Sequence, residues 1–145
     1  MKFEKTVSHL LSRVATAHKR HIERRLNEIG LHSGQAMILF ELWKRDGMRQ
    51  IDLAKNLSVA APTINKSVAG LAAVGLIVSE KIDGDARSTR VFLTEEGSKM
   101  RDGIDELWFE IEEEILTELT ETERLILFDL LTKLSHYYLG TEHEE

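Results

Sequence analysis

Apolar positions in the first thirty residues recur at steps of three and four, the spacing of one helical stripe. We expect a long amphipathic helix that stops at Gly30. Its stripe comprises Phe3, Val7, Leu10, Leu11, Val14, Ala17, His18, His21, Ile22, Leu26 and Ile29. Ser33 is predicted to cap a second helix that ends near Asp46-Gly47. This helix carries Met37, Leu39, Phe40, Leu42 and Trp43.

Two shorter helical patterns occupy the middle of the chain. The first covers roughly residues 50–57, and a turn at Ser58-Val59-Ala60 leads into the second. The second begins at residue 61 or 62 and runs to about residue 74. Pro62 suits its first turn, where a missing N–H costs nothing, and Gly75 stops it.

A strand pair follows these two helices. Residues 76–81 and 89–93 have strand composition, and Asp83-Gly84-Asp85 between them is typical of a turn. Helix, turn, helix and hairpin in this order suit duplex DNA. The second helix can enter the major groove while the hairpin reaches the neighbouring minor groove.

The C-terminal third predicts two more helices. Thr94 caps the first, and Thr120-Glu121-Thr122-Glu123 is a capping box for the second, which continues through Tyr138. The first carries Met100, Ile104, Leu107, Trp108, Ile111, Ile115, Leu116 and Leu119. The terminal helices hold more apolar surface than the central region can cover, so we expect a homodimer. A two-fold protein implies a pseudo-palindromic DNA site with half-sites about one helical turn apart.

The net charge of −6 is unevenly distributed. Residues 1–43 carry 7 Lys and Arg against 4 Asp and Glu, and residues 44–101 carry 10 against 7. Residues 102–145 carry 2 against 14. The acidity is therefore confined to the C-terminal third, and the helix-turn-helix segment is mildly basic, which favours contact with phosphates.

Composition narrows the class of protein. A chain of 145 residues with 42% hydrophobic and 30% charged residues indicates one globular domain. With no cysteine, the chain has no disulfide and no thiolate metal site. No apolar run is long enough to span a membrane and no signal peptide is recognisable, so we expect a cytoplasmic protein. Because Gly-rich phosphate loops and hydrolase motifs are missing, we do not expect an enzyme.

Several segments together resemble the MarR (multiple antibiotic resistance regulator) family of dimeric winged helix-turn-helix transcription factors. They are residues 31–35, 50–57, 59–66, 71–77, Asp85-Ala86-Arg87 and Leu93-Thr94-Glu95-Glu96-Gly97. The most specific element is the Asp-x-Arg hairpin followed by Leu-Thr-x-x-Gly after a helix-turn-helix.

The resemblance implies a mainly α fold with a small β-hairpin wing, in one domain over residues 1–145. The winged helix-turn-helix would cover residues 31–101, and residues 1–30 and 102–145 would form dimerisation helices. It further implies a repressor that has no cofactor. A small aromatic or lipophilic ligand would modulate its binding to DNA.

The chain departs from the family pattern at several positions, among them Ser79 and Glu80, which stand where basic residues are frequent. The family often caps its two DNA-binding helices with Ser or Thr, and Arg49 and Ala60 occupy these positions here. Each missing cap costs about 1 kcal/mol of stability. Ala86 replaces the first of two adjacent wing arginines, and Gly70 lies inside the second helix. Affinity for phosphates is therefore expected to be modest.

The hairpin and the second short helix hold the residues most suited to DNA contact. Arg87 can enter a narrow minor groove while Asp85 orients its guanidinium, although a solvated ion pair is the alternative. Asn65 can pair with adenine, and Thr63 or Ala61 can contact a thymine methyl. The candidates for phosphate contact are Lys66, which also suits guanine, and Lys55, Arg49 and Arg90.

Histidines on the first helix allow a second class of function. His18 and His21 lie one turn apart, a spacing that can chelate zinc, although no third ligand is evident nearby. A ligand pocket is the other interpretation, with Met37, Trp43 and Trp108 as further lining residues. A ligand- or zinc-binding sensor with weakened DNA binding is thus the alternative function, and ordinary core positions are the simplest explanation of these side chains.

Overall fold

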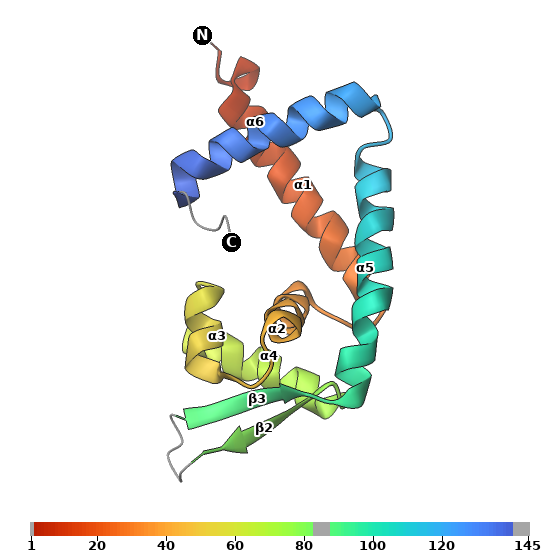
Figure 1. Cartoon of the computed structure of the whole chain (residues 1–145). Coiled ribbons are helices and arrows are strands. Elements are labelled where there is room, and N and C mark those ends of the chain that lie inside the picture. Colours follow the sequence, from red (N-terminus) through yellow and green to blue (C-terminus); the bar gives the residue numbers. More distant parts are fainter. Residues whose placement is uncertain (1, 83–87, 141–145) are drawn as a thin grey trace. The chain divides into compact units, whose positions relative to one another are not determined.

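The computed structural model describes residues 2–82 and 88–140. It divides into two compact units, Met1–Trp108 and Phe109–Glu145. The first unit contains, in order, η1 (Phe3–Lys5), α1 (Val7–Asn27), α2 (Ser33–Lys44), β1 (Met48–Arg49), α3 (Gln50–Asn56), α4 (Ala61–Ala73), β2 (Ile77–Lys81), β3 (Thr89–Leu93) and the start of α5 (Glu95–Ile115). The second unit contains the end of α5 and α6 (Glu121–Leu139) (Figure 1). No helix among the described residues has both the length and the apolarity needed to cross a membrane.

A three-stranded antiparallel sheet supports one end of the first unit. The strand order is β1-β3-β2, with Met48 opposite Val91 and Ile77 opposite Leu93. Strands β2 and β3 are the hairpin that the sequence predicts. The sequence did not predict β1, because two residues show no alternation and β1 exists only through its pairing with β3.

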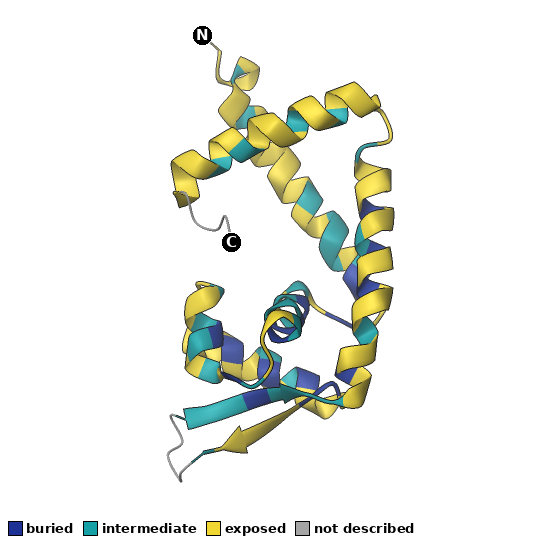
Figure 2. Cartoon of the chain, viewed as in Figure 1, coloured by how far each residue is buried: buried dark blue, intermediate teal, exposed yellow. Residues whose placement is uncertain are grey.

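The core of the first unit lies between the helices and the sheet. Helix α4 packs against both α2 and α3, and their inward faces are the buried ones (Figure 2). The buried side chains include Leu26, Leu31, Ile38, Leu39, Leu42, Leu53, Ile64, Val68, Leu71, Ile77, Val91 and Ile104. Each fully buried aliphatic side chain contributes about 1.5–3 kcal/mol. The prediction that Ile64, Val68 and Leu71 form the core face of α4 is confirmed.

Most helix ends follow the signals in the sequence. Gly30 and Gly75 lie three and two residues past the ends of α1 and α4, and both adopt a φ of +79°, a conformation that suits glycine. Thr94 Oγ1 accepts the Gly97 N–H at 3.1 Å, which caps α5. Thr120 and Glu123 form the expected capping box of α6.

The start of α2 differs from the prediction. Ser33 is the first residue of the helix and His32 precedes it, so the expectation that Ser33 caps α2 is wrong. Glu23 of α1 accepts the Ser33 N–H at 3.0 Å and bonds His32 Nδ1 at 3.0 Å. Gln35 Oε1 accepts the His32 N–H at 2.9 Å. Gln35 of α2 thus supplies a local part of the cap, and Glu23 of another helix supplies a part that local sequence cannot show.

The sequence predicts two other helices to extend further than they do in the structure. Phe3 belongs to a separate 3₁₀ turn, and α1 starts at Val7 with Thr6 Oγ1 accepting the His9 N–H at 3.1 Å. Helix α5 ends at Ile115 and does not reach Leu119. In both places the apolar spacing continues past the true helix end, because a turn can keep the same spacing for a few residues.

The turn between α5 and α6 is held by one arginine in the second unit. Arg124 pairs with Glu113 at 2.8 Å and donates to the Leu116 carbonyl at 3.0 Å and, more weakly, to the Leu119 carbonyl at 3.4 Å. These bonds satisfy carbonyls that the end of α5 leaves without helical partners.

Candidate nucleic-acid interface

Helix α4 has two chemically distinct faces. Ile64, Val68 and Leu71 lie on the face that is buried in the core of the first unit. The opposite face near its N-terminus is exposed and carries four of the predicted DNA contacts: Ala61, Thr63, Asn65 and Lys66. A helix with a fixed apolar face and a free polar face near its N-terminus can enter a major groove without losing its packing.

The N-terminus of α4 has no side-chain cap. Ala60 precedes the helix in an extended conformation and its side chain accepts no hydrogen bond. Arg49 precedes α3 in the same way. The missing side-chain caps noted in the sequence are therefore confirmed; in α4, Pro62 has no N–H and the Thr63 N–H donates to the Ala60 carbonyl at 3.0 Å.

A close approach of α2 and α4 explains the glycine inside α4. A Cβ built on Gly70 would lie 2.6 Å from Gln35 Nε2, and one on Gly34 would lie 3.3 Å from Ser67 Oγ. Gln35 is the residue that accepts the His32 N–H, so Gly70 leaves room for a side chain engaged at the start of α2. The packing offsets the cost of a helical glycine, which is about 1 kcal/mol against alanine.

Asn65 is in contact with the first residue of α3. Gln50 Nε2 donates a hydrogen bond to Asn65 Oδ1, across fifteen residues of sequence. Asn65 is exposed and Gln50 is half-buried. The sequence alone does not indicate Gln50, because a contact between two helices leaves no local pattern in either helix.

Two of the three arginine and lysine candidates around α4 have intramolecular partners. Arg49 pairs with Asp52 at 3.0 Å, and the Arg49 hydrogen bond lowers the pKa of the Asp52 carboxyl. Arg90 donates to the Gly47 carbonyl at 2.9 Å. Lys55 is exposed on α3. Phosphate contact by Arg49 would therefore compete with Asp52, which reduces what that contact can contribute.

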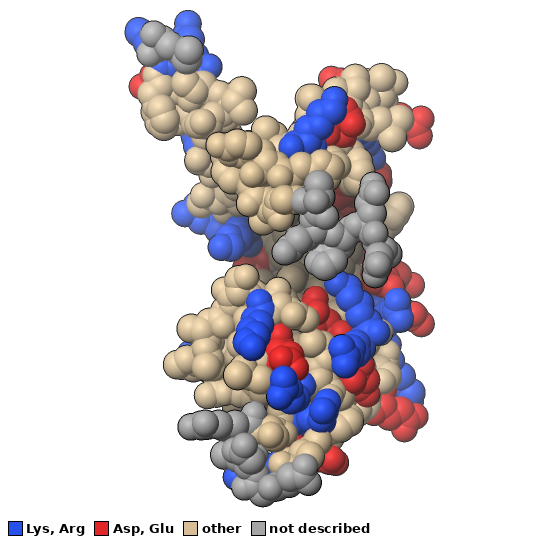
Figure 3. Space-filling view, turned by 60° about the vertical axis from the view of Figure 1, so that its left-hand side comes forward, with Lys and Arg blue, Asp and Glu red and all other residues tan. Residues whose placement is uncertain are grey.

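Basic and acidic side chains are mixed around this surface. Figure 3 brings the α3 side of the first unit forward, and Lys and Arg there lie among Asp and Glu. A mixed surface gives a weak general attraction to phosphates and leaves more of the selectivity to individual contacts.

The hairpin lies beside α4, which packs against its strand β2. Residues 83–87 lie outside the described residues, and Asp85 and Arg87 are among them. The strands that lead to the tip, β2 and β3, pair over their whole length from Ile77–Leu93 to Lys81–Thr89. The roles of Asp85 and Arg87 remain predictions.

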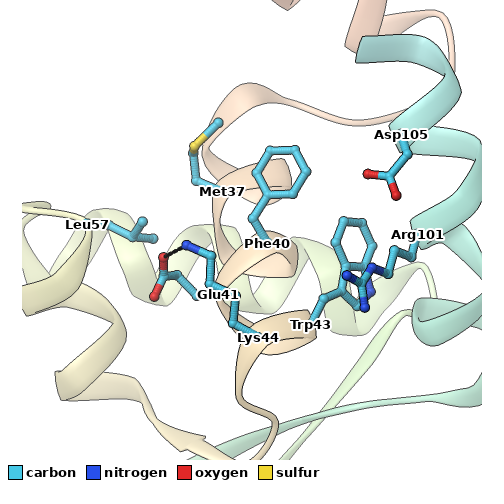
Figure 4. Close-up of a pocket in the computed structure, with 8 residues that line it drawn as sticks. All are labelled: Met37, Phe40, Glu41, Trp43, Lys44, Leu57, Arg101 and Asp105. Carbon is cyan, nitrogen blue, oxygen red and sulfur yellow. Dashed lines mark hydrogen bonds and ion pairs between the residues drawn. The ribbon is translucent and has the colours of Figure 1, made fainter. Parts of the chain in front are cut away.

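A shallow pocket of about 310 Å³ opens on the first unit (Figure 4). Of the five predicted pocket residues, Met37 and Trp43 line it, and Trp108 lies 5.9 Å from Phe40, centroid to centroid. His18 and His21 are not among the lining residues. The lining that sequence analysis missed comprises Phe40, Glu41, Lys44, Leu57, Arg101 and Asp105.

Two of the predicted pocket residues have evident structural contacts. Trp43 Nε1 donates to the Gly97 carbonyl at 3.0 Å, which ties α2 to the start of α5. His21 Nδ1 lies 2.9 Å from an Arg24 nitrogen on the same helix. Within residues 2–82 and 88–140, no three His, Asp or Glu side chains come together as a metal site would require.

Comparison with known proteins shows which family has this fold. A model of the MarR family matches residues 31–89, the segment from the start of α2 to the start of β3. This region is therefore similar to the MarR family. A MarR transcriptional regulator from Methanosarcina mazei Go1 has a similar structure, with a TM-score of 0.77 and 24% identity over 96% of this chain and 92% of the other.

Two further solved structures show the same fold. The MepR–DNA complex of S. aureus has a TM-score of 0.71 and 26% identity, covering 89% of this chain and 96% of MepR. BpsR of Bordetella bronchiseptica, whose DNA binding is regulated by 6-hydroxynicotinic acid, has a TM-score of 0.77 and 23% identity, covering 93% and 98%. The predicted fold class, mainly α with a winged helix-turn-helix, is confirmed, and the fold is that of MarR transcriptional regulators.

Proposed function

We propose that this chain is a sequence-specific, DNA-binding transcriptional repressor that acts as a homodimer. The observation that carries the proposal is the two-faced α4, whose exposed polar N-terminal side rests on a buried apolar side within a MarR-type winged helix. Of the structurally similar proteins, MepR is recorded bound to DNA.

Each candidate residue has a distinct task in this proposal. Thr63 and Asn65 contact base edges in the major groove, and Ala61 packs against a thymine methyl. Lys66 and Lys55 contact phosphates, which sets register and affinity. Arg49 and Arg90 are secondary phosphate contacts. Arg87, oriented by Asp85, enters the adjacent minor groove.

Exposed apolar side chains support the homodimer. In α6, Leu125 and Phe128 are 73% and 74% exposed, and Tyr137 is 82% exposed. In α1, Val7 and Val14 are 72% and 63% exposed. An apolar surface of this extent on terminal helices marks an interaction site. We assign residues 31–101 to DNA binding and residues 1–30 and 102–145 to dimerisation, within one domain.

The pocket gives the regulator a place for an effector. Phe40 and Trp43 supply aromatic faces, and the cations Lys44 and Arg101 lie beside the carboxylates Glu41 and Asp105. This lining suits a small aromatic acid, the chemical class of the BpsR regulator 6-hydroxynicotinic acid. Such a ligand changes DNA affinity only if it binds the free and DNA-bound conformations differently.

Selection of bound duplexes from a random DNA pool, at two salt concentrations, tests the proposal. We expect an enriched pseudo-palindrome and an affinity that falls steeply as salt rises. Failure to enrich any sequence, with binding lost at moderate salt, would contradict it. The uncapped α3 and α4 and the intramolecular bonds of Arg49 and Arg90 would then favour the second candidate, a ligand- or zinc-binding sensor with weakened DNA binding.

A further inference from the structure

Helix α1 is attached to the winged helix near its C-terminal end. Residues 10–17 of α1 are exposed, and its buried and half-buried positions lie mainly between residues 21 and 26 (Figure 2). Among the described elements that follow it, α1 packs chiefly on α2. The end of α1 and the start of α2 therefore form a joint, and the N-terminal half of α1 extends away from it.

The carboxylate of Glu23 links the two helices across this joint. Glu23 Oε2 accepts the Ser33 N–H at 3.0 Å, and Glu23 Oε1 lies 3.0 Å from His32 Nδ1. One carboxylate of α1 thus binds two successive residues at the start of α2, with each oxygen bound by a different residue. Hydrogen bonds to an ionised acceptor are stronger than neutral ones, and a negative charge suits a helix N-terminus.

Apolar packing and hydrogen bonds have different effects at this joint. Leu26 and Leu31 are buried on either side of Gly30, which has a φ of +79°. Burial of apolar surface is non-directional, so it holds the two helices together without fixing the angle between them. Hydrogen bonds depend on angle as well as distance, so the two bonds of the Glu23 carboxylate restrict that angle.

Helix α1 converts a small rotation at the joint into a large displacement. At 1.5 Å per residue, the distance along the axis from Glu23 to Val7 is about 24 Å. A rotation of about 10° at the joint moves the Val7 end by about 4 Å, slightly more than the rise of about 3.4 Å for one base pair. Val7 and Val14 belong to the proposed dimerisation surface, so the angle at the joint affects where each winged helix lies relative to its partner.

Resting on the proposed function, we infer that Glu23 is a positioning residue that fixes the spacing of the two DNA half-sites. In a homodimer, the separation of the two α4 helices depends on two copies of this joint. With the Glu23 carboxylate bound to α2, each winged helix is held in one orientation, and one spacing fits best. Without it, each winged helix orients more freely, so other spacings are accepted and preorganisation for the best one is lost.

The test measures binding to duplexes that carry the half-site selected by the wild-type chain, with the spacer shortened or lengthened in steps of a single base pair. We expect the wild type to prefer one spacer length. In Glu23→Ala, the preference for that spacer over its neighbours should fall about threefold to tenfold, because a preformed geometry is lost. Base preferences within the half-site should stay unchanged, because Glu23 lies outside α4. A loss of stability alone would weaken binding to every spacer equally.

His32→Ala is a second and milder variant. It removes one of the two bonds and keeps the bond from the Ser33 N–H. The His32 side chain is 73% exposed, so its removal should leave the fold intact. We expect a smaller fall in spacer preference in the same direction. If Glu23→Ala does not fold, His32→Ala decides the outcome.

Gln35→Ala is the matched control at the same helix start. Gln35 Oε1 accepts the His32 N–H at 2.9 Å from within α2, so its removal weakens the cap of α2 and leaves the link from Glu23 in place. This variant should keep the spacer preference of the wild type. An equal fall in Gln35→Ala would mean that weakening the start of α2 is sufficient, and would overturn the role of Glu23.

The outcomes also distinguish this inference from the proposed function. If the wild type enriches a pseudo-palindrome but binds all spacers equally, Glu23 does not fix the spacing and the regulator stands. The same conclusion follows if Glu23→Ala and His32→Ala keep the wild-type spacer preference. No enrichment by the wild-type chain overturns the proposed function, and the inference fails with it.

Discussion

At the scale of single residues, Gly97 is the position with the least space. A Cβ built there would lie 2.1 Å from the backbone carbonyl oxygen of Leu76. Backbone cannot move aside as the end of a flexible side chain can. The same oxygen accepts the Thr94 N–H at 3.0 Å, so a shift of Leu76 would also disturb the start of α5.

We expect Gly97→Ala to lower the free energy of unfolding by about 1–3 kcal/mol, the usual cost of overpacking. Gly103 on the same helix is the matched control, because nothing lies within 4 Å of a Cβ built there. Gly103→Ala should raise stability by up to about 1 kcal/mol through helix propensity alone. Urea unfolding of both variants checks this, and equal effects would contradict it.

Glu23 binds the start of α2 through its carboxylate. Hydrogen bonds from Ser33, through its side chain and its N–H, and from His32 lower the pKa of the Glu23 carboxyl. A carboxyl with a lowered pKa in the folded state stabilises the fold above its unfolded pKa. That contribution is lost as the pH falls through the folded-state pKa.

Glu23→Gln should therefore destabilise the chain at neutral pH, and the difference from wild type should shrink as the pH falls below the ordinary range of glutamate. Unfolding curves recorded between neutral pH and the acid limit of folding check this. Asp129→Asn is the control, because Asp129 forms an exposed pair with Lys133 at 3.1 Å and such pairs contribute little at any pH. A pH-independent Glu23→Gln effect would refute the capping role.

At the scale of secondary-structure elements, α4 lacks a cap that its sequence could readily supply. Residue 62 is proline and has no N–H, so Ala60→Ser places a hydroxyl near the Thr63 N–H, which also bonds the Ala60 carbonyl at 3.0 Å and would be shared between the two acceptors. We expect a gain of about 0.5–1 kcal/mol in thermal unfolding experiments. Ala69→Ser, on the exposed interior of α4, should cost a few tenths of a kcal/mol, about what helix propensity assigns to serine. A loss of stability in Ala60→Ser would contradict the assignment of Ala60 as the N-cap.

Local signals in the sequence were sufficient for most elements. Glycine stops, threonine caps and apolar spacing act within a few residues, so the helices, the β2–β3 hairpin and the core face of α4 were predictable. Features that depend on contacts between residues far apart in the sequence were not predictable. Strand β1 needs β3, part of the cap of α2 comes from Glu23, and Gln50 meets Asn65 across fifteen residues.

The candidate site was predictable to the same extent. The exposed face of α4 follows from helical periodicity, so Thr63, Asn65 and Lys66 could be named from the sequence. The intramolecular partners of Arg49 and Arg90 could not, because they depend on tertiary structure. The lining of the pocket was not fully predictable for the same reason, because Arg101 and Asp105 of α5 join residues of α2 only in the tertiary structure.

At the scale of the whole molecule, charge and apolar surface are divided along the chain. The mildly basic DNA-binding region is followed by a C-terminal third with 14 acidic and 2 basic residues. In the proposed complex, repulsion from phosphates would keep that acidic segment away from DNA, and its exposed apolar side chains would favour association between chains. Dimerisation should therefore depend on α6 and not on the surface of the winged helix.

Leu125→Glu/Phe128→Glu places charges at two of the most exposed apolar positions of α6, so the cost to an isolated chain is small. We expect sedimentation equilibrium to show a dimer for the wild type and a monomer for this variant. Val74→Glu/Val78→Glu is the control, at positions of the first unit that are 60% and 46% exposed, and should remain dimeric. A dimeric Leu125→Glu/Phe128→Glu variant would remove this face of α6 from the interface.

The central claim is that two copies of α4 enter successive major grooves of one DNA site. Methylation interference on the enriched duplex tests it most directly, because methyl groups at guanine N7 obstruct the major groove and those at adenine N3 obstruct the minor groove. We expect major-groove interference in two clusters about one helical turn apart, with minor-groove interference beside each where the wing lies. A single cluster, or interference from the minor groove alone, would contradict the account.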